Sequence, residues 1–372
     1  MSPILIVLQP TSYCNISCEY CYVRERSDRM LMSREVLIAV GQKIFASLDR
    51  TMPPTVIWHA GEPLTAPIKW YNDAYDILEK YAPPETRFAL QTNGISIDDD
   101  WIDLFRRTNT AVGLSIDGPE KHHDAKRKTK QGKGTWALAV RGLERLQAAG
   151  FFPHVITVLS PDSLKHSQAF FEFYKSHSIT HVGFNIDEQE GLNSISSFGS
   201  NFPKKPIVRF LAELLQLARA ANYPLHIREI ERITRALVGN REVRNEQVIP
   251  WGIIIIGKRG EVSTFSPELL GQPSVQYDNF CFSNIIGEQV DWNSKALIVA
   301  SSNIAAGVER CRRECDYFSV CGGGAPINKF AELGTFNASE TNFCKLTVQA
   351  SADALRLFLT MPPCAHATAE IM

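Results

Sequence analysis

Residues 14–22 have the sequence Cys14-Asn-Ile-Ser-Cys18-Glu-Tyr-Cys21-Tyr22, a C-x3-C-x2-C run that follows a short apolar stretch, Ile4–Gln9. Three thiolates within eight residues are too close to spread out, so we expect them to surround a single metal centre. Iron–sulfur cubanes usually take four cysteine ligands, one for each iron. Three cysteines therefore leave one iron with an open position, where a substrate or cofactor can bind. The alternative is a structural zinc site whose remaining ligand comes from elsewhere.

Short apolar runs alternate with helical segments through the first half of the chain. Six runs end in polar or glycine-rich turns, and five segments with helical periodicity separate them. This alternation indicates a parallel sheet built from βαβ units. Six units fall short of the eight of a closed barrel, so we expect an α/β fold with a partial (β/α)6 barrel of the TIM type. The expected strands are Ile4–Gln9, Thr55–His59, Arg87–Thr92, Ala111–Asp117, His154–Leu159 and His181–Asp187, and the expected helices are Ser33–Leu48, Ile68–Tyr81, Asp99–Arg107, Trp136–Ala149 and Leu164–His177.

The pattern changes after the sixth apolar run. A stretch rich in Ser, Asn, Gly and Pro, Gly191–Lys205, precedes two further helices. Ile253–Ile256 and Glu261–Phe265 flank a glycine-rich turn and predict a β-hairpin, which cysteine-bearing loops and a closing helix, Thr347–Leu359, follow. We therefore expect a barrel over residues 1–225, a bridging helix over 226–250, and a cysteine-rich domain with a frayed tail over 251–372.

Composition and charge narrow the class of protein. The 372 residues are 44% hydrophobic and 21% charged, as in ordinary globular proteins, which excludes disordered and collagen-like chains. A net charge of −1 argues against a general binder of nucleic acid or anionic membrane. The first apolar run is too short for a signal peptide or a membrane span, so we expect a cytoplasmic protein. In a reducing cytosol, clustered cysteines bind metal or do redox chemistry more often than they form disulfides.

A second cysteine cluster lies near the C-terminus. It has the sequence Cys311-Arg-Arg-Glu-Cys315-Asp-Tyr-Phe-Ser-Val-Cys321-Gly-Gly-Gly324, and Cys344 follows about twenty residues later. Four thiolates complete the ligand set of a cubane or of a tetrahedral zinc ion. The glycines allow backbone amides to approach the sulfur atoms. Cys281 by itself cannot hold a cubane, and we expect Cys364 to be an incidental thiol.

The N-terminal cysteine run, with Tyr20 before its last cysteine, resembles the signature of radical S-adenosylmethionine (SAM) enzymes. The resemblance implies that Cys14, Cys18 and Cys21 hold a [4Fe–4S] cluster whose open iron is chelated by SAM. In that family the cluster donates one electron, SAM splits, and a 5′-deoxyadenosyl radical abstracts a hydrogen atom. A one-electron reductant of the flavodoxin or ferredoxin type is then an implied partner.

Motifs after three later apolar runs agree with this resemblance. Ala60-Gly61-Glu62-Pro63-Leu64 is similar to the family's Gly-Gly-Glu-Pro-Leu, with alanine in place of the first glycine, and it would receive the SAM amine. The alternative for Glu62 is a helix cap before a proline turn. By the same resemblance, Ser115 and Arg127 clamp the SAM carboxylate, since a hydroxyl and a guanidinium suit it. The other basic residues of 121–133 are expected to form a solvated loop. The residues that the resemblance assigns to SAM are Tyr20, Gly61, Glu62, Asn93, Ser115 and Arg127.

The C-terminal cysteines resemble the SPASM extension of radical SAM peptide maturases, together with Pro326, Asn328-Lys329 and the segment 340–344. The resemblance implies an auxiliary [4Fe–4S] cluster. The usual extension binds two auxiliary clusters, but two of the cysteine positions are here occupied by Ser266-Pro267 and Ala325. We therefore predict one auxiliary cluster and a second one that is vestigial or absent, with Cys281 its lone remaining candidate. The ligands implied for the auxiliary cluster are Cys311, Cys315, Cys321 and Cys344.

The pattern is similar to that of maturases that cross-link aromatic residues, the GrrM-type enzymes and the wider three-residue cyclophane synthases, over residues 4–350. It implies an enzyme that abstracts a β-hydrogen from a ribosomally made precursor peptide and joins that carbon to an aromatic ring. Asp117, Asp187 and Glu188, at expected strand ends, are the candidate bases, although such carboxylates also serve as caps. With no domain expected before the first strand, leader binding would use the barrel, the extension or a separate partner.

Two other functions stay open. A sulfatase-type maturase would oxidise a Cys or Ser to formylglycine, but its members carry the full cysteine set in the extension. The other open function is that of a non-catalytic iron–sulfur or zinc protein. That function does not explain why Glu62, Ser115 and Arg127 lie near successive strand ends.

Overall fold

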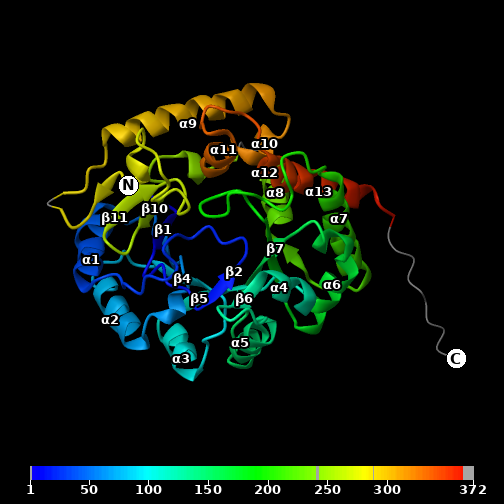
Figure 1. Cartoon of the computed structure of the whole chain (residues 1–372), viewed down its shortest axis with the longest axis horizontal. Coiled ribbons are helices and arrows are strands. Elements are labelled where there is room, and N and C mark those ends of the chain that lie inside the picture. The colour runs from blue at the N-terminus through cyan, green and yellow to red at the C-terminus, as the bar shows by residue number, and fades with distance from the viewer. Residues whose placement is uncertain (1, 240–242, 288, 363–372) are drawn as a thin grey trace.

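The computed structural model describes residues 2–239, 243–287 and 289–362. It has an α/β fold built on one mostly parallel sheet, with the strands at the centre and helices around them (Figure 1). The strand order is β12-β11-β10-β1-β3-β4-β5-β7-β8-β9. The strands are β1 Leu5–Leu8, β3 Thr55–Trp58, β4 Arg87–Thr92, β5 Thr110–Ser115, β7 His154–Leu159, β8 His181–Ile186, β9 His226–Ile227, β10 Ile253–Ile256, β11 Glu261–Thr264 and β12 Ser283–Asn284.

The six expected strands are confirmed, and they lie side by side in chain order as β1, β3, β4, β5, β7 and β8. Each pairs in parallel with the next, as βαβ connections require. The polar residues that follow these strands therefore meet at one edge of the sheet, the usual place for chemistry in such folds.

The hairpin expected after residue 250 is part of the same sheet. β10 pairs in parallel with β1, with Ile254 opposite Ile6 and Ile256 opposite Leu8. All four residues of β10 are buried, which suits a strand covered on both faces. The cysteine-rich region is thus joined to the barrel by backbone hydrogen bonds, while the division at residues 225 and 250 stays a prediction.

The helices pack around the sheet, and most of them match the expected segments. The closing helix α13 lies along α7 (Figure 1). No described helix is long and apolar enough to cross a membrane. The helices are α1 Arg34–Ala39, α2 Ile68–Leu78, α3 Asp99–Arg107, α4 Glu120–Lys126, α5 Trp136–Ala148, α6 Ser167–Ser176, α7 Lys205–Ala220, α8 Arg228–Gly239, α9 Lys295–Glu314, α10 Phe318–Cys321, α11 Pro326–Leu333, α12 Asn342–Cys344 and α13 Ala350–Thr360.

The prediction of a solvated loop over residues 121–133 is wrong, because the backbone of this segment forms a helix and a strand. Glu120–Lys126 form α4, and the next three residues form β6 (Arg127–Thr129), which pairs antiparallel with β2 (Ile16–Cys18). In this ladder Cys18 lies opposite Arg127. The side chain of Arg127 is buried beside Cys18.

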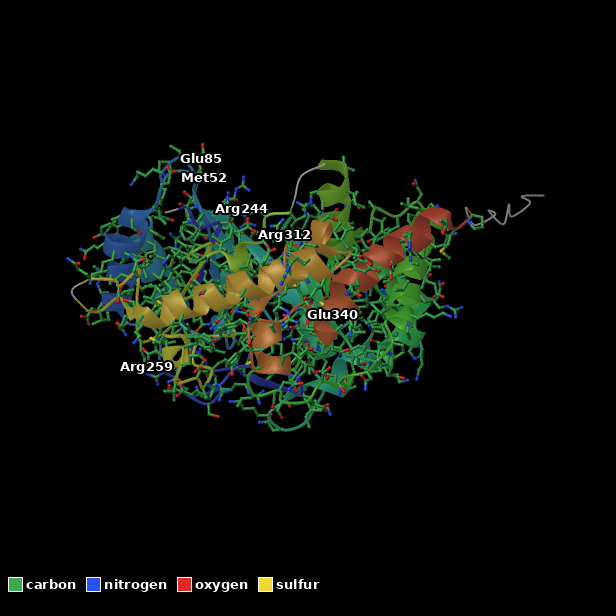
Figure 2. The ribbon with its side chains drawn as sticks, turned by 90° about the horizontal axis from the view of Figure 1, so that it is seen from above. Met52, Glu85, Arg244, Arg259, Arg312 and Glu340 are labelled. Carbon is green, nitrogen blue, oxygen red and sulfur yellow. The ribbon has the colours of Figure 1, made fainter. Side chains whose placement is uncertain are left out.

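The long helix α9 was not expected from the sequence, which predicted loops between the hairpin and the closing helix. The signals were nevertheless present: the Ser294 side chain caps the helix by accepting from the Leu297 amide, and buried residues recur every three or four positions as far as Cys311. The helix lies across the outer surface, with Arg312 near one end (Figure 2). It packs on a separate aromatic core that contains Phe265, Phe280 and Phe336.

A close backbone approach at Gly307 holds α9 in place. A Cβ atom on Gly307 would lie 2.0 Å from the carbonyl oxygen of Phe336. We expect Gly307→Ala to lower the free energy of unfolding by about 1–3 kcal/mol, because the neighbouring backbone must move. Gly239→Ala is the matched control: it is also helical and has open space around it, so it should be neutral or stabilising by up to about 1 kcal/mol. Chemical denaturation of both variants checks this, and equal effects would contradict it.

Candidate active site

The three N-terminal cysteines lie together on one wall of a cavity of about 550 Å³. Cys14 follows β1, Cys18 ends β2, and Cys21 lies in the next turn. Burial raises the pKa of Cys14 to about 12 and that of Cys18 to about 11. Thiols buried in this way ionise only when a cation compensates the charge, as a bound metal does. The wall is therefore suited to a metal centre.

The spacing of the sulfur atoms bears on which metal centre fits. A tetrahedral zinc ion, with Zn–S bonds of about 2.3 Å, needs sulfur atoms about 3.8 Å apart. Among the described residues, the one group with three such ligand atoms within 4.8 Å of one another consists of His122, Asp162 and His166, and it includes no cysteine. Both cysteine sets are thus spaced more widely than a single zinc ion requires. This spacing fits the larger volume of a multi-iron cluster.

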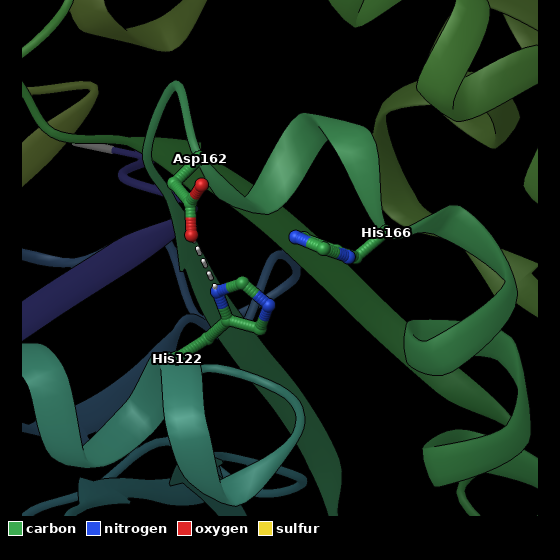
Figure 3. Close-up of side chains that lie close together, drawn as sticks. All are labelled: His122, Asp162 and His166. Carbon is green, nitrogen blue, oxygen red and sulfur yellow. Dashed lines mark ion pairs between the residues drawn. The ribbon is translucent and has the colours of Figure 1, made fainter.

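That histidine group lies outside the cavity, between α4 and the loop before α6 (Figure 3). His122 Nδ1 is 3.8 Å from an oxygen of Asp162, and its ring packs on Phe170 with the centroids 5.2 Å apart. Burial lowers the pKa of His122. We interpret these contacts as a brace between α4 and α6.

Arg127 and Asp117 form a buried ion pair beside the cysteines. Arg127 Nε lies 3.0 Å from Asp117 Oδ2, and the hydroxyl of Tyr20 donates to the same oxygen at 2.6 Å. The other oxygen of Asp117 accepts from the amide of Val158 at 2.9 Å. Arg127 Nη1 is 3.8 Å from Cys18 Sγ. Both carboxylate oxygens of Asp117 thus accept hydrogen bonds, so this residue positions Tyr20 and Arg127.

Glu62 is fixed by three donors at the end of β3. Its oxygens accept from the amide of Leu64 at 2.9 Å, the hydroxyl of Thr92 at 2.6 Å and the amide of Asn93 at 2.7 Å. Burial raises the pKa of Glu62, although these donors oppose the effect. Glu62 caps the 3-10 turn 63–65, so the alternative role expected for it, that of a cap, is present in the structure. The carboxylate nevertheless lines the cavity.

The loop that carries Glu62 requires a glycine. Gly61 has φ +54°, and a Cβ there would lie 2.5 Å from the carbonyl oxygen of Tyr13. Ala60 also has a positive φ of 75°, which is strained for a residue with a side chain. The remaining residues that the resemblance assigns to SAM line the same cavity: Tyr20, Asn93, Ser115 and Arg127.

The candidate bases differ in their surroundings. Asp187 accepts from the side chain of Asn193 at 2.6 Å and from the amide of Ser197 at 3.1 Å, so it fixes the loop after β8. Glu188 instead lines the cavity and accepts from the Asn328 side chain at 2.8 Å. Burial raises the pKa of Glu188 to about 8.

The C-terminal cysteines form a second sulfur-rich region. Cys321 and Cys344 line the same cavity as the N-terminal set. Backbone amides approach their sulfur atoms, from Gly324 at 3.2 Å and from Thr341 at 3.3 Å. Amide donors of this kind are typical of cluster ligands. All eight described cysteines are free thiols.

Lys329 is a site residue that the sequence analysis left without a role. Its ammonium group is buried and lies 3.3 Å from Cys311 Sγ, so it favours the thiolate. The signal available was only a lysine beside Asn328 in the short helix Pro326–Leu333. Cys281 donates to the Ser283 carbonyl and is not among the described residues of the cavity lining. Cys364 lies outside the described residues.

Comparison with known proteins places this site in a family. The profile of the Radical SAM superfamily matches residues 8–173. The uncharacterized protein sll1766 of Synechocystis is 36% identical over 360 residues, which cover 94% of this chain and 90% of that protein. The chain belongs to the radical SAM superfamily. Membership implies a [4Fe–4S] cluster and SAM, and the free, partly buried and widely spaced thiols of residues 14–21 fit that cluster.

Sulfatase-maturating enzymes are among its further relatives. The serine-type anaerobic sulfatase-maturating enzyme of Bacteroides thetaiotaomicron is 32% identical over 191 residues, which are 49% of this chain and 46% of that enzyme. The solved structure of anSMEcpe with bound AdoMet superposes with a TM-score of 0.77 at 18% identity, covering 96% of each chain. Streptococcus suis SuiB bound to its precursor peptide SuiA gives 0.62 at 12% identity, over 93% of this chain and 76% of SuiB. These structures establish the shared fold.

His123 provides a pH-dependent test of the wall that carries Asp117. Its Nδ1 accepts from the Asp117 amide at 3.2 Å, its Nε2 lies 3.0 Å from the Thr135 hydroxyl, and burial lowers its pKa to about 4. An imidazole that is neutral in the fold takes up a proton on unfolding below pH about 6.5, so stability falls as the pH decreases. We expect about 2 kcal/mol of stability to be lost through His123 between pH 7.5 and 5.

The measurement is the free energy of unfolding of the native protein and of His123→Gln at several pH values in this window. The variant should show a pH dependence shallower by about this amount. Parallel curves for the two proteins would show that His123 is not a buried neutral group.

Proposed function

We propose that this chain is a radical SAM maturase that modifies a ribosomally made precursor peptide and joins a β-carbon of that peptide to an aromatic ring. The observation that carries the proposal is that one cavity is lined by the N-terminal cysteines, by Cys321 and Cys344 of the C-terminal set, and by Glu188. When bound, the N-terminal cluster and SAM supply the radical that removes the first hydrogen. Structural neighbours bound to peptides, such as SuiB with SuiA, support a peptide substrate.

The cross-link determines what the chain must provide. Joining a β-carbon to a ring removes two hydrogens, one as an atom and the other as a proton and an electron. Glu188 is the proposed proton acceptor, because it faces the cavity while Asp117 and Asp187 are held by other groups. The C-terminal cysteines, with the ammonium of Lys329 beside Cys311, are the proposed site of the cluster that takes the electron. A flavodoxin- or ferredoxin-type reductant is the proposed partner.

Formylglycine formation on a Cys or Ser remains the second candidate, because the sulfatase-maturating relatives align with about half of this chain and about half of their own length. It would use the same cavity. On a serine it removes two hydrogens, and on a cysteine the resulting thioaldehyde also exchanges its sulfur for the oxygen of water, with release of H2S. The replacements at Ser266 and Ala325 favour the cross-linking reaction. Membership of an enzyme superfamily argues against a non-catalytic binding protein.

The test of the reaction is co-expression with a short precursor peptide, taken from any short open reading frame that is found beside the gene. We expect the peptide to lose two hydrogens in mass, and tandem fragmentation to find no cleavage between an aromatic residue and a residue close to it. A mass loss that maps to one Cys or Ser would instead establish formylglycine formation. An unmodified peptide despite SAM cleavage would contradict both reactions.

Cysteine substitutions test the two clusters separately. Cys14→Ala combined with Cys18→Ala should lose about four irons per chain and all reductive cleavage of SAM. Cys321→Ala combined with Cys344→Ala should lose about four irons and keep SAM cleavage. Cys281→Ala is the control and should keep all of the roughly eight irons. Iron analysis after anaerobic reconstitution checks this, and about four irons in the native protein would exclude the auxiliary cluster.

Glu188→Gln tests the proton acceptor. With a pKa of about 8, Glu188 is ionised only as the pH rises, so kcat/KM for the peptide should increase with pH and level off above about pH 8. The variant should lose this inflection and slow the modification roughly 100- to 10,000-fold, while still cleaving SAM. The exposed Glu79→Gln is the control. A normal pH profile in Glu188→Gln would rule out this assignment.

A further inference from the structure

One wall of the cavity carries acidic and acceptor groups, of which the proposed reaction uses only Glu188. Two loops build it, one after β8 and one after β11, together with the turn after Cys21 and the residue after β3. We call this set the acidic wall. The acidic wall consists of Tyr22, His59, Glu188, Glu190 and Glu268, all of which line the cavity.

The carboxylates of the acidic wall have no cationic partner. None of them forms an ion pair with a basic side chain in the part of the chain that the structure describes. The nearby Arg228 is bound to Glu229 and to the side chain of Asn185 at 2.8 Å. Arg232 donates to the carbonyl of Cys321 at 3.4 Å. The basic residues of the cavity are therefore engaged elsewhere.

Two neutral groups of the acidic wall are also without partners. The hydroxyl of Tyr22 and Nδ1 of His59 are buried, and neither has a hydrogen-bond partner. Burial lowers the pKa of His59, so this imidazole is neutral and offers a lone pair. Buried polar atoms without partners are costly and are rare unless a ligand satisfies them. Both groups are close to the Glu268 carboxylate, whose charge acts on each of them.

The chain is built to hold the acidic wall together. The amide of Leu192 donates to the Tyr22 carbonyl at 3.1 Å, and Gly191 allows this approach because a Cβ there would lie 2.3 Å from that oxygen. Phe265 has φ +76°, and Ser266, which follows it, donates to Glu268. Both loops are thus fixed on the cavity.

The arrangement of acceptors indicates what kind of ligand fits. Three metal-ligating atoms of the acidic wall do not come within 4.8 Å of one another in the described residues, so the wall is too open for one bare divalent ion. Ammonium and guanidinium groups carry three and five N–H donors and no acceptor, which matches a wall of acceptors. Such a group on a flexible stem can reach a buried wall from the body of a peptide.

We propose that the acidic wall binds a cationic side chain, a lysine or an arginine, of the substrate peptide, an inference that rests on the peptide-maturase function proposed above. Binding replaces the missing counter-charge and provides donors for Tyr22 and His59. Mutual repulsion adds to burial in raising the pKa of Glu190 and Glu188, so a bound cation lowers both. The arrival of the substrate then ionises Glu188, the proposed proton acceptor.

The test compares three synthetic peptides, acetyl-Gly-Trp-Gly-X-Gly-amide with X as lysine, arginine or the uncharged norleucine. Their binding to the anaerobically reconstituted protein with SAM is measured by calorimetry. We expect lysine or arginine to bind at least about tenfold more tightly than norleucine, as charged hydrogen bonds imply. In Glu190→Gln combined with Glu268→Gln, the difference in affinity between the cationic peptides and the norleucine peptide should fall below about twofold. The matched control, Glu79→Gln combined with Glu144→Gln, changes two exposed carboxylates and should keep the gap.

Equal affinities in the native protein would overturn the proposal, as would a gap that persists in the Glu190 and Glu268 variant. Iron content and the cluster absorbance show that each variant is folded and loaded. Peptide modification is measured separately by mass. Cation-selective binding without modification would therefore count against the proposed reaction alone, and modification without cation selectivity would count against the acidic wall alone.

Discussion

The buried ion pair between Arg127 and Asp117 links the cysteine loop to the sheet. Asp117 follows β5, and Arg127 begins β6, which pairs with the strand that ends at Cys18. A buried charge without its partner is strongly unfavourable, so the two residues must stay together. Because Tyr20 donates to the same carboxylate, the pair fixes the loop, the tyrosine and the guanidinium near Cys18 in one arrangement. The geometry of the N-terminal metal site depends on this one contact.

The parallel pairing of β10 with β1 has a comparable effect on the other side of the cavity. It joins the cysteine-rich region to the rest of the sheet through backbone hydrogen bonds, so Cys321 and Cys344 line the same cavity as the N-terminal cysteines. The helix α9 and the aromatic core beneath it then position Cys311 next to Lys329. The acidic wall is built from loops of both regions, so one side of the cavity carries carboxylates and hydrogen-bond acceptors.

Much of the fold and part of the site could be predicted from the sequence. The six βα units were correct because each depends on the local alternation of apolar and polar residues. The helix α9 was not predicted, although the Ser294 cap and the spacing of its buried residues are local signals of a helix. The prediction of a loop after residue 120 was wrong because a run of basic residues resembles one, whereas the structure has α4 and β6 there. Arg127, which the prediction had set apart from that loop, is buried against Asp117.

By itself, the sequence determined the strand–helix order, the two cysteine spacings and membership of a chemical class, since all of these are properties of residues close together in the chain. The tertiary structure decided which carboxylates face the cavity, which are held by other groups, and that Tyr22 and His59 are left without partners beside Glu268. These outcomes depend on contacts between segments far apart in the chain. Local periodicity carries no record of such contacts, because it reports only which face of an element is buried.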